Sequence, residues 1–421
     1  MQTTTLDNQT VRRRNGPPRQ RPVSVSTRIL GFAALALIVL IAASCASMAR
    51  DGRRLLRDGR YDGAIERFTR HLAEQPDDWK VREQLAYANL KGGDYPEAVR
   101  EFQTVLNQRP DASDAALYLG LALLRSGQLE AGIDVWRDFL SKGPSGQVRE
   151  VRRLLTLLEI AESRRFAVAA VGSPDGGMEL DGSRSDFAVI YYNDLSAEKG
   201  LGAVQKSLAA MIISDLGRVE GLQVVNRFRM DALLEEMVFR QSGLVDEGQV
   251  REAGRMLAGE YLIYGTLSTL LKDLRVNTTI YRTGSEPMVE SFLYSDPLDN
   301  FYELQKKIVF SVLERSQHPV SDAQKKRIAD PHTDDFNAFL HFGQGLDALD
   351  AGEWETARYF FERAVDEDSG FRLAREALQA CPAGAGIDFG LVERMGLDPR
   401  ANALVTDRLE RVVERMAPLV D

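Results

Sequence analysis

Residues 93–110 read GDYPEAVREFQTVLNQRP, and related stretches begin at Gly59 and at Gly127. Neighbouring copies are therefore 34 residues apart. A fixed period of this length indicates an array of repeated helical units. The copies share a glycine, an aromatic residue or leucine, a small residue, a large aromatic residue and a closing proline: Gly59, Tyr61, Ala64, Phe68 and Pro76; Gly93, Tyr95, Ala98, Phe102 and Pro110; Gly127, Leu129, Gly132, Trp136 and Pro144.

Each shared position has a physical role in a pair of packed helices. A glycine ends the first helix, where a left-handed backbone conformation is needed. Small residues allow the two helices to approach closely, and one more small residue stands seven positions before each glycine, at Gly52, Ala86 and Gly120. The large aromatic residue fills the space between neighbouring units. The proline stops the second helix before the next unit begins.

This pattern resembles the tetratricopeptide repeat. The resemblance implies helical hairpins that stack into a curved solenoid, with a concave groove that holds a peptide or helix of a partner protein. A fourth copy follows far downstream, and Trp354 within it is expected to be a packing residue rather than part of a ligand-binding box. Its residues in the shared positions are Gly345, Gly352, Trp354, Ala357, Phe361 and Ala364, with Ser369 in place of the proline.

The N-terminal segment has the layout of a secretory signal. Six arginines within residues 1–44 precede an apolar run over residues 29–43, which is shorter than the roughly 20 residues of a membrane-spanning helix. Residues 42–45, Ala-Ala-Ser-Cys, resemble the lipobox of bacterial lipoproteins. The resemblance implies that residues 1–44 are removed and that Cys45 is acylated, which predicts an outer-membrane lipoprotein facing the periplasm. An uncleaved anchor in the inner membrane is the alternative.

Charge and cysteine content exclude several classes of protein. The net charge of the chain is -9, and the part after residue 44 is more acidic still, because the arginine-rich segment holds only one acid. Nucleic-acid phosphates would repel such a body, so DNA or RNA binding is not expected. Apart from Cys45 the chain has one cysteine, Cys381, so neither a disulfide framework nor a zinc cluster is expected.

The middle of the chain, residues 164–318, predicts an α/β domain with a mixed sheet. Short strands are expected over 166–171, 187–192 and 222–226, and three antiparallel strands over 261–267, 274–281 and 288–294. Helices are expected over 201–216, 230–239, 250–257 and 300–314. A helix over 148–163 precedes the domain and is expected to cap the solenoid.

This succession resembles the CsgG-like and TolB-N-terminal-like domains of bacterial envelope proteins. The resemblance rests on residues 189–194, 215–225, 229–235, 241–245 and 258–265. In curli-secretion members of that family, extra strands assemble into a transmembrane barrel. Residues 261–294 have room for three core strands but not for two additional membrane hairpins, so a secretion pore is not favoured.

Nothing in the sequence predicts an enzyme. The four histidines, His71, His318, His332 and His341, form no metal-ligand pattern, and His71 stands in a repeat packing position. Cys381 has no neighbouring cysteine or basic residue that would lower its pKa. We therefore expect no catalytic residue, no metal site and no cofactor.

The prediction as a whole is an α+β protein of three folded regions. Residues 45–163 are expected to form a solenoid of three repeats with a capping helix, residues 164–318 the α/β domain, and residues 319–421 a helical region with one further repeat. The expected function is a membrane-anchored scaffold or adaptor that binds envelope proteins, in secretion or surface-structure assembly, with self-association as a further possibility. Two alternatives stay open: a ring or channel component of a curli-type secretion system, and a ligand-sensing α/β domain with accessory repeats.

Overall fold

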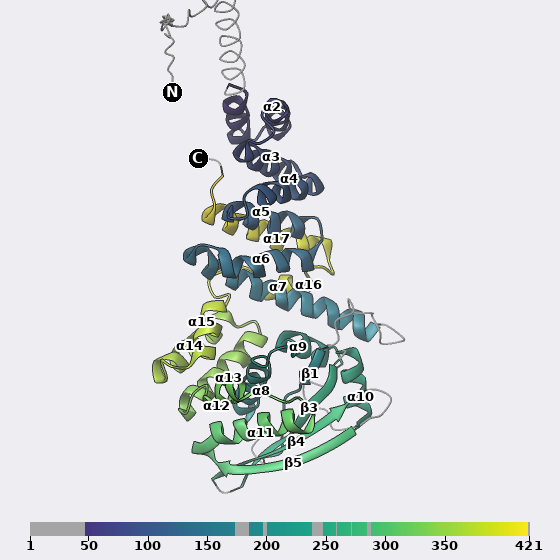
Figure 1. Cartoon of the computed structure of the whole chain (residues 1–421), viewed down its shortest axis with the longest axis vertical. Helices are drawn as coiled ribbons and strands as arrows, with labels where there is room; N and C mark the ends of the chain where they lie inside the picture. The colour runs from purple at the N-terminus through teal and green to yellow at the C-terminus, as the bar shows by residue number, and fades with distance from the viewer. Residues whose placement is uncertain are drawn as a thin grey trace, which may run out of the picture. The chain divides into compact units, whose positions relative to one another are not determined.

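The computed structural model describes residues 47–172, 185–196, 200–237, 247–257, 259–270, 272–283 and 288–419. The chain divides into two compact units, residues 1–81 and residues 82–421. Most of the described elements are helices arranged as repeated hairpins, and a small mixed sheet lies in the middle of the sequence (Figure 1). The predicted fold class is confirmed at this level.

The first unit contains the first helical hairpin. A helix over residues 47–57 is followed by α2 (Tyr61–Glu74), and Gly59 between them has a φ of +70°. Phe68 is fully buried and lies against Gly52, where an added β-carbon would stand 2.5 Å from the ring. The small residue therefore allows the two helices of this repeat to approach closely.

The second unit begins with the remaining N-terminal hairpins. They consist of α3 (Trp79–Gly92), α4 (Tyr95–Gln108), α5 (Ser113–Arg125) and α6 (Leu129–Lys142), followed by the long helix α7 (Ser145–Gly172). Gly93 and Gly127 have positive φ values of 88° and 80° at the ends of α3 and α5. Trp136 is fully buried beside Gly120 and donates a hydrogen bond from Nε1 to the carbonyl oxygen of Leu117 at 3.0 Å.

The strand predicted over residues 166–171 is wrong, because α7 continues through this segment to Gly172. A short apolar run cannot by itself distinguish a strand from a buried helix. Phe166, Ala167 and Ala170 are spaced as one helical face and are buried with residues of α9 (Arg227–Glu236). Helix α7 thus extends from the repeats into the packing of the α/β domain, across the boundary expected at residue 163.

The sheet is mixed. It contains β1 (Ser185–Val189), β2 (Asn193–Asp194), β3 (Gly259–Leu270), β4 (Asp273–Arg282) and β5 (Met288–Pro297). The order of the strands is β1-β3-β4-β5, with β2 also paired to β3; β1 and β2 run parallel to β3, and the other pairs are antiparallel. The strand predicted over 222–226 is reduced to one bridge between Phe187 and Val224.

Helices cover both faces of the sheet. On one face lie α8 (Gly202–Leu216) and α11 (Phe301–Arg315), the latter preceded by the short 3-10 helix η1 (Leu298–Asn300). On the other face, α9 and α10 (Glu247–Met256) pack near β1 and β3. Apart from the strand predicted over 222–226, the helices and strands predicted between residues 201 and 314 occur, with bounds shifted by a few residues.

The regular elements described in the C-terminal region are all helices. These are α12 (Asp322–Ala329), α13 (Phe336–Asp350), α14 (Trp354–Glu367), α15 (Arg372–Ala380), α16 (Phe389–Arg394) and α17 (Pro399–Met416). Helices α13 and α14 form the fourth hairpin. Gly352 between them has a φ of +74°, and Phe361 lies over Gly345.

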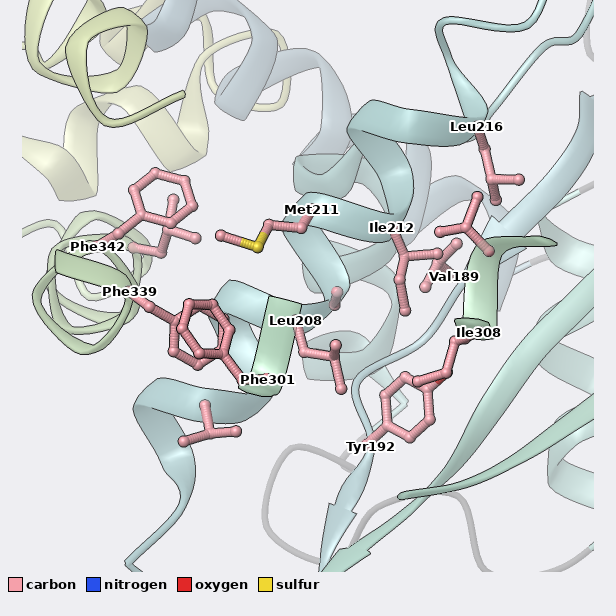
Figure 2. Packing of buried hydrophobic residues seen from close by; sticks show 14 of the residues in the cluster. Val189, Tyr192, Leu208, Met211, Ile212, Leu216, Phe301, Ile308, Phe339 and Phe342 are labelled. Carbon is pink, nitrogen blue, oxygen red and sulfur yellow. The ribbon is translucent and has the colours of Figure 1, made fainter. Parts of the chain in front are cut away.

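One hydrophobic core joins this fourth hairpin to the α/β domain. Figure 2 shows Phe339 of α13 next to Phe301 of α11 and close to Leu208 of α8, and the two phenyl centroids are 4.3 Å apart. At Gly343 an added β-carbon would stand 2.0 Å from the carbonyl oxygen of Ala203, so α13 and α8 touch almost backbone to backbone. The core thus extends across the boundary expected at residue 318.

A buried cluster of charged side chains, Asp215, Lys306 and His332, lies in the same part of the protein. The Asp215 side chain is fully buried; it accepts a hydrogen bond from Lys306 Nζ at 2.6 Å, and its Oδ1 lies 2.9 Å from His332 Nε2. Burial lowers the pKa of His332, although the neighbouring carboxylate opposes the shift. Burial alone would raise the pKa of Asp215, but His332 and Lys306 bring it below its ordinary value.

The close approach of helices at Gly120 gives a first prediction. A Gly120→Ala β-carbon would stand 2.1 Å from Trp136 Nε1, and the indole is held by its hydrogen bond, so we expect the substitution to lower the free energy of unfolding by about 1–3 kcal/mol. The urea midpoint of the helical circular dichroism signal measures the change. Gly146→Ala is the matched control, because nothing lies within 4 Å of the added carbon; an equal loss there would contradict the packing argument.

The lowered pKa of His332 gives a second prediction. As the pH falls below the ordinary value of 6.5, the unfolded chain binds a proton at this histidine before the folded chain does, so the folded form loses stability. Between about pH 7.5 and about pH 5.5, His332→Gln should reduce the decline of the unfolding free energy, by at most about 1.4 kcal/mol per pH unit. Equal pH slopes for the two proteins in urea titrations would show that the folded protein takes up the proton as readily as the unfolded chain.

Candidate protein-binding groove

Polar side chains gather on one side of α3, α5 and the start of α7. Lys91 and Arg125 are 34 residues apart and hold the same place in two successive repeats, five residues after the small residue of the first helix. Tyr87 stands one turn before Lys91 on α3. Tyr118 of α5 and Gln147 of α7 complete the set. We call the face that carries these five side chains the basic groove.

The basic groove is occupied by α17 of the same chain. Figure 1 shows α17, in yellow, running along α5, and the two helices are in contact. Lys91 Nζ lies 2.6 Å from Glu410 Oε1 and 3.0 Å from Glu414 Oε1. Arg125 pairs with the same Glu410 and lies 2.6 Å from Asp407. The two cations of the groove therefore bind three carboxylates from three successive turns of one helix.

The groove also binds the carboxyl end of α17. Tyr118 Oη donates to the carbonyl oxygen of Ala417 at 2.8 Å, and Gln147 Nε2 donates to that of Met416 at 3.0 Å. The last carbonyls of a helix have no partner within the helix and need donors from elsewhere. In addition, the Tyr87 hydroxyl donates to Glu414 at 2.9 Å. The groove thus satisfies both the acidic side chains and the exposed backbone end of this helix.

The central ion pairs are shielded from water. The side chains of Arg125 and Glu410 are 14% and 12% exposed, whereas Asp407 at the edge is 52% exposed. Burial alone would lower the pKa of Lys91, but its hydrogen bonds and charge interactions with Glu410 and Glu414 raise the pKa above the ordinary value. Charge-assisted hydrogen bonds of this kind are stronger than neutral ones. Arg125 and Glu410 are therefore expected to contribute most of the charge recognition.

Sequence reasoning located the groove in general terms but not these residues. A basic residue at the same repeat position in all three N-terminal copies, Arg57, Lys91 and Arg125, is a signal that was present in the sequence. The sequence of α17 had no comparable pattern that would predict its binding to the groove. Helix α17 has a buried stripe at Ala401, Val405 and Leu409, which reads as an ordinary amphipathic helix.

The residues of the repeat pattern lie where helices meet or end. Ala64, Phe68, Ala98, Phe102, Trp136, Ala357 and Phe361 are all fully buried. The glycines follow first helices, and Pro76, Pro110 and Pro144 follow α2, α4 and α6. Trp354 at the start of α14 packs edge-on against Phe389, with ring centroids 5.3 Å apart. Cys45 lies outside the described residues.

The histidines and Cys381 are dispersed in the structure. His71 Nε2 lies 2.9 Å from Asp78, His341 Nδ1 lies 2.7 Å from Glu367, and His318 is adjacent to the ring of Phe187. Cys381 is buried, donates to the carbonyl oxygen of Trp354 at 3.3 Å, and has a pKa raised by burial. Within the described residues no three histidine, cysteine or acidic side chains are grouped for a metal.

Comparison with known proteins agrees with the repeat assignment. Residues 55–117 match the family model of the tetratricopeptide repeat. No curated protein sequence matches the chain. As far as residues 47–419 are described, no helix combines the length and hydropathy required of a membrane span.

Several solved structures are similar to the chain in part. A tetratricopeptide repeat protein from Parabacteroides merdae has 12% identity and a TM-score of 0.27, covering 80% of this chain and 99% of the other. The tetratricopeptide domain of P58(IPK) has 15% identity and a TM-score of 0.28, covering 88% and 89%. Yeast Tom70 has 12% identity and a TM-score of 0.25, covering 89% and 77%. These likenesses are too weak to relate the whole folds, and the assignment rests on residues 55–117, which form a tetratricopeptide repeat segment.

Proposed function

We propose that this protein is a lipid-anchored scaffold of the bacterial envelope that holds other proteins through its tetratricopeptide repeats. The observation that carries the proposal is the basic groove, in which side chains of two successive repeats and of α7 bind a protein helix through ion pairs and backbone contacts. A surface built to hold a helix is a protein-binding surface. Within the described residues no group of histidine, cysteine or acidic side chains is arranged to hold a metal ion.

The anchor in this proposal is Cys45. It follows an arginine-rich segment and an apolar run, and the residues around it resemble a lipobox. Two or three acyl chains on one cysteine would hold the protein stably on a membrane, since one chain alone binds only marginally. An outer-membrane location facing the periplasm follows from the resemblance, with an inner-membrane anchor as the alternative.

The central domain is part of the same proposal. Its parallel β1 and β3, its antiparallel β3–β5 and its flanking helices agree with the order expected of a CsgG-like or TolB-N-terminal-like domain. We infer that it supports assembly at the envelope, either by presenting the groove or by self-association.

Lipid attachment can be tested with the two cysteines of the chain. The full-length protein, expressed in a bacterium fed with radiolabelled palmitate, should incorporate label and sediment with membranes. Cys45→Ser should abolish the label. Cys381→Ser is the matched control and should retain it, because its thiol is buried. Absence of label from the unaltered protein, with membrane sedimentation retained, would instead indicate an uncleaved anchor.

Scaffolding can be tested by cross-linking the tagged full-length protein in living cells with formaldehyde. Mass spectrometry of the captured complexes should identify the same envelope proteins in independent preparations. The Cys45→Ser variant, which lacks the acyl chains and their attachment site, should capture them less efficiently. Capture of this chain alone would contradict the scaffold and support a ring of identical subunits.

A further inference from the structure

We propose that the basic groove recognises the carboxyl-terminal end of an acidic amphipathic helix, and that α17 is a resident occupant that a partner helix of the same chemistry displaces. This inference deepens the proposed function, because it names the kind of partner that the scaffold takes. It rests on the contacts between α17 and α3, α5 and α7.

The groove sets a spacing for the carboxylates of its ligand. Asp407, Glu410 and Glu414 are at positions i, i+3 and i+7, so they lie on one side of α17. Lys91 reaches the last two and Arg125 the first two. A helix without acids at these positions would leave both cations partly buried and unpaired, which is costly. The groove therefore selects for acidic helices.

The groove also sets the position at which the helix ends. Tyr118 and Gln147 donate to the carbonyl oxygens of Ala417 and Met416, and Met416 is the last residue of α17. In a longer helix these carbonyls would also accept from backbone amides of the next turn, so the two donors would have to share them. The preferred ligand thus ends two to three residues after its third carboxylate.

The polar contacts of α17 with the groove are the part open to competition. Helix α17 also buries an apolar stripe that includes Val405 and Leu409, whereas Asp407 and Glu414 at the edges of the groove are 52% and 34% exposed. Such edge pairs contribute little individually in water. A ligand in the same chain is nevertheless favoured by an effective concentration in the millimolar range, about that of short flexible linkers. A partner helix must therefore compete with α17, and weakening α17 should increase its binding.

Two exposed arginines of α17 offer a matched control. Arg408 and Arg411 are exposed, whereas Glu410 faces the groove and is 12% exposed. One double variant reverses the charges of Arg408 and Arg411, and the other reverses those of Glu410 and Glu414. Both change two residues of α17, but only the second brings cations against the cations of the groove. The two double variants therefore separate loss of the groove contacts from general damage to the helix.

The test measures binding of a fluorescein-labelled synthetic peptide of residues 397–417 to the full-length protein in detergent, by fluorescence anisotropy. Glu410→Lys/Glu414→Lys should release α17 and bind the peptide at least tenfold more tightly than the unaltered protein. Hydrogen exchange of residues 399–416 should accelerate in the same variant. Arg408→Glu/Arg411→Glu should match the unaltered protein in both measurements.

Reversing the groove supplies the complementary test. Lys91→Glu/Arg125→Glu should also release α17, yet it should not bind the peptide, and combining all four reversals should protect α17 from exchange again. A neutral peptide, carrying Asp407→Asn, Glu410→Gln and Glu414→Gln, should bind the Glu410→Lys/Glu414→Lys protein at least tenfold more weakly than the acidic peptide. Far-ultraviolet circular dichroism checks that every variant retains its helices.

Two results would overturn the inference. One is unchanged exchange in α17 and unchanged peptide binding after Glu410→Lys/Glu414→Lys, which would make α17 a permanent part of the fold. The other is equal binding of the acidic and the neutral peptide. Failure of the scaffold itself is distinguishable, because in that case peptide binding would respond as expected while cross-linking in cells captured no envelope protein.

Discussion

The structure depends on the close approach of paired helices at small residues. At Gly120 and Gly345 a large aromatic ring of the following helix occupies the space that a β-carbon would need. The same constraint recurs between different regions, where Gly343 brings α13 against α8. Because the pairs are packed this tightly, the first helix of each hairpin presents its other side in a fixed orientation. That side carries the charges that bind neighbouring elements.

The repeat position five residues after the small residue illustrates this consequence. In the second and third repeats it holds Lys91 and Arg125, which bind acids of α17. In the fourth repeat it holds Asp350, which pairs with Arg227 and lies 2.6 Å from Lys206 of the α/β domain. Burial alone would raise the pKa of Asp350, but Arg227 and Lys206 bring it below its ordinary value. One position of the repeat thus serves recognition in both places, with the sign of its charge matched to the element it contacts.

These contacts give the proposed function a physical basis. The α/β domain shares its core and a buried set of charges with the fourth hairpin, so this part of the molecule is joined by extensive packing. Helix α17 binds the basic groove through ion pairs and hydrogen bonds in addition to burying an apolar stripe that includes Val405 and Leu409. Regions joined by apolar cores are stable, whereas contacts that depend on partly exposed charges respond to competitors and to salt. The proposed exchange of protein ligands therefore depends on the charged part of the contact between α17 and the basic groove.

The sequence by itself determined the repeats, their glycine turns and their packing residues, because each depends on partners within one unit of 34 residues. It also predicted most strands and helices of the central domain, whose hydrophobic patterns are local. Tertiary structure alone decided the remainder. The apolar residues 166–171 became helix because α9 buries one helical face of them. The pairing of Tyr87 with Glu414 and of Tyr118 with Ala417 joins residues 327 and 299 positions apart, which no local pattern encodes.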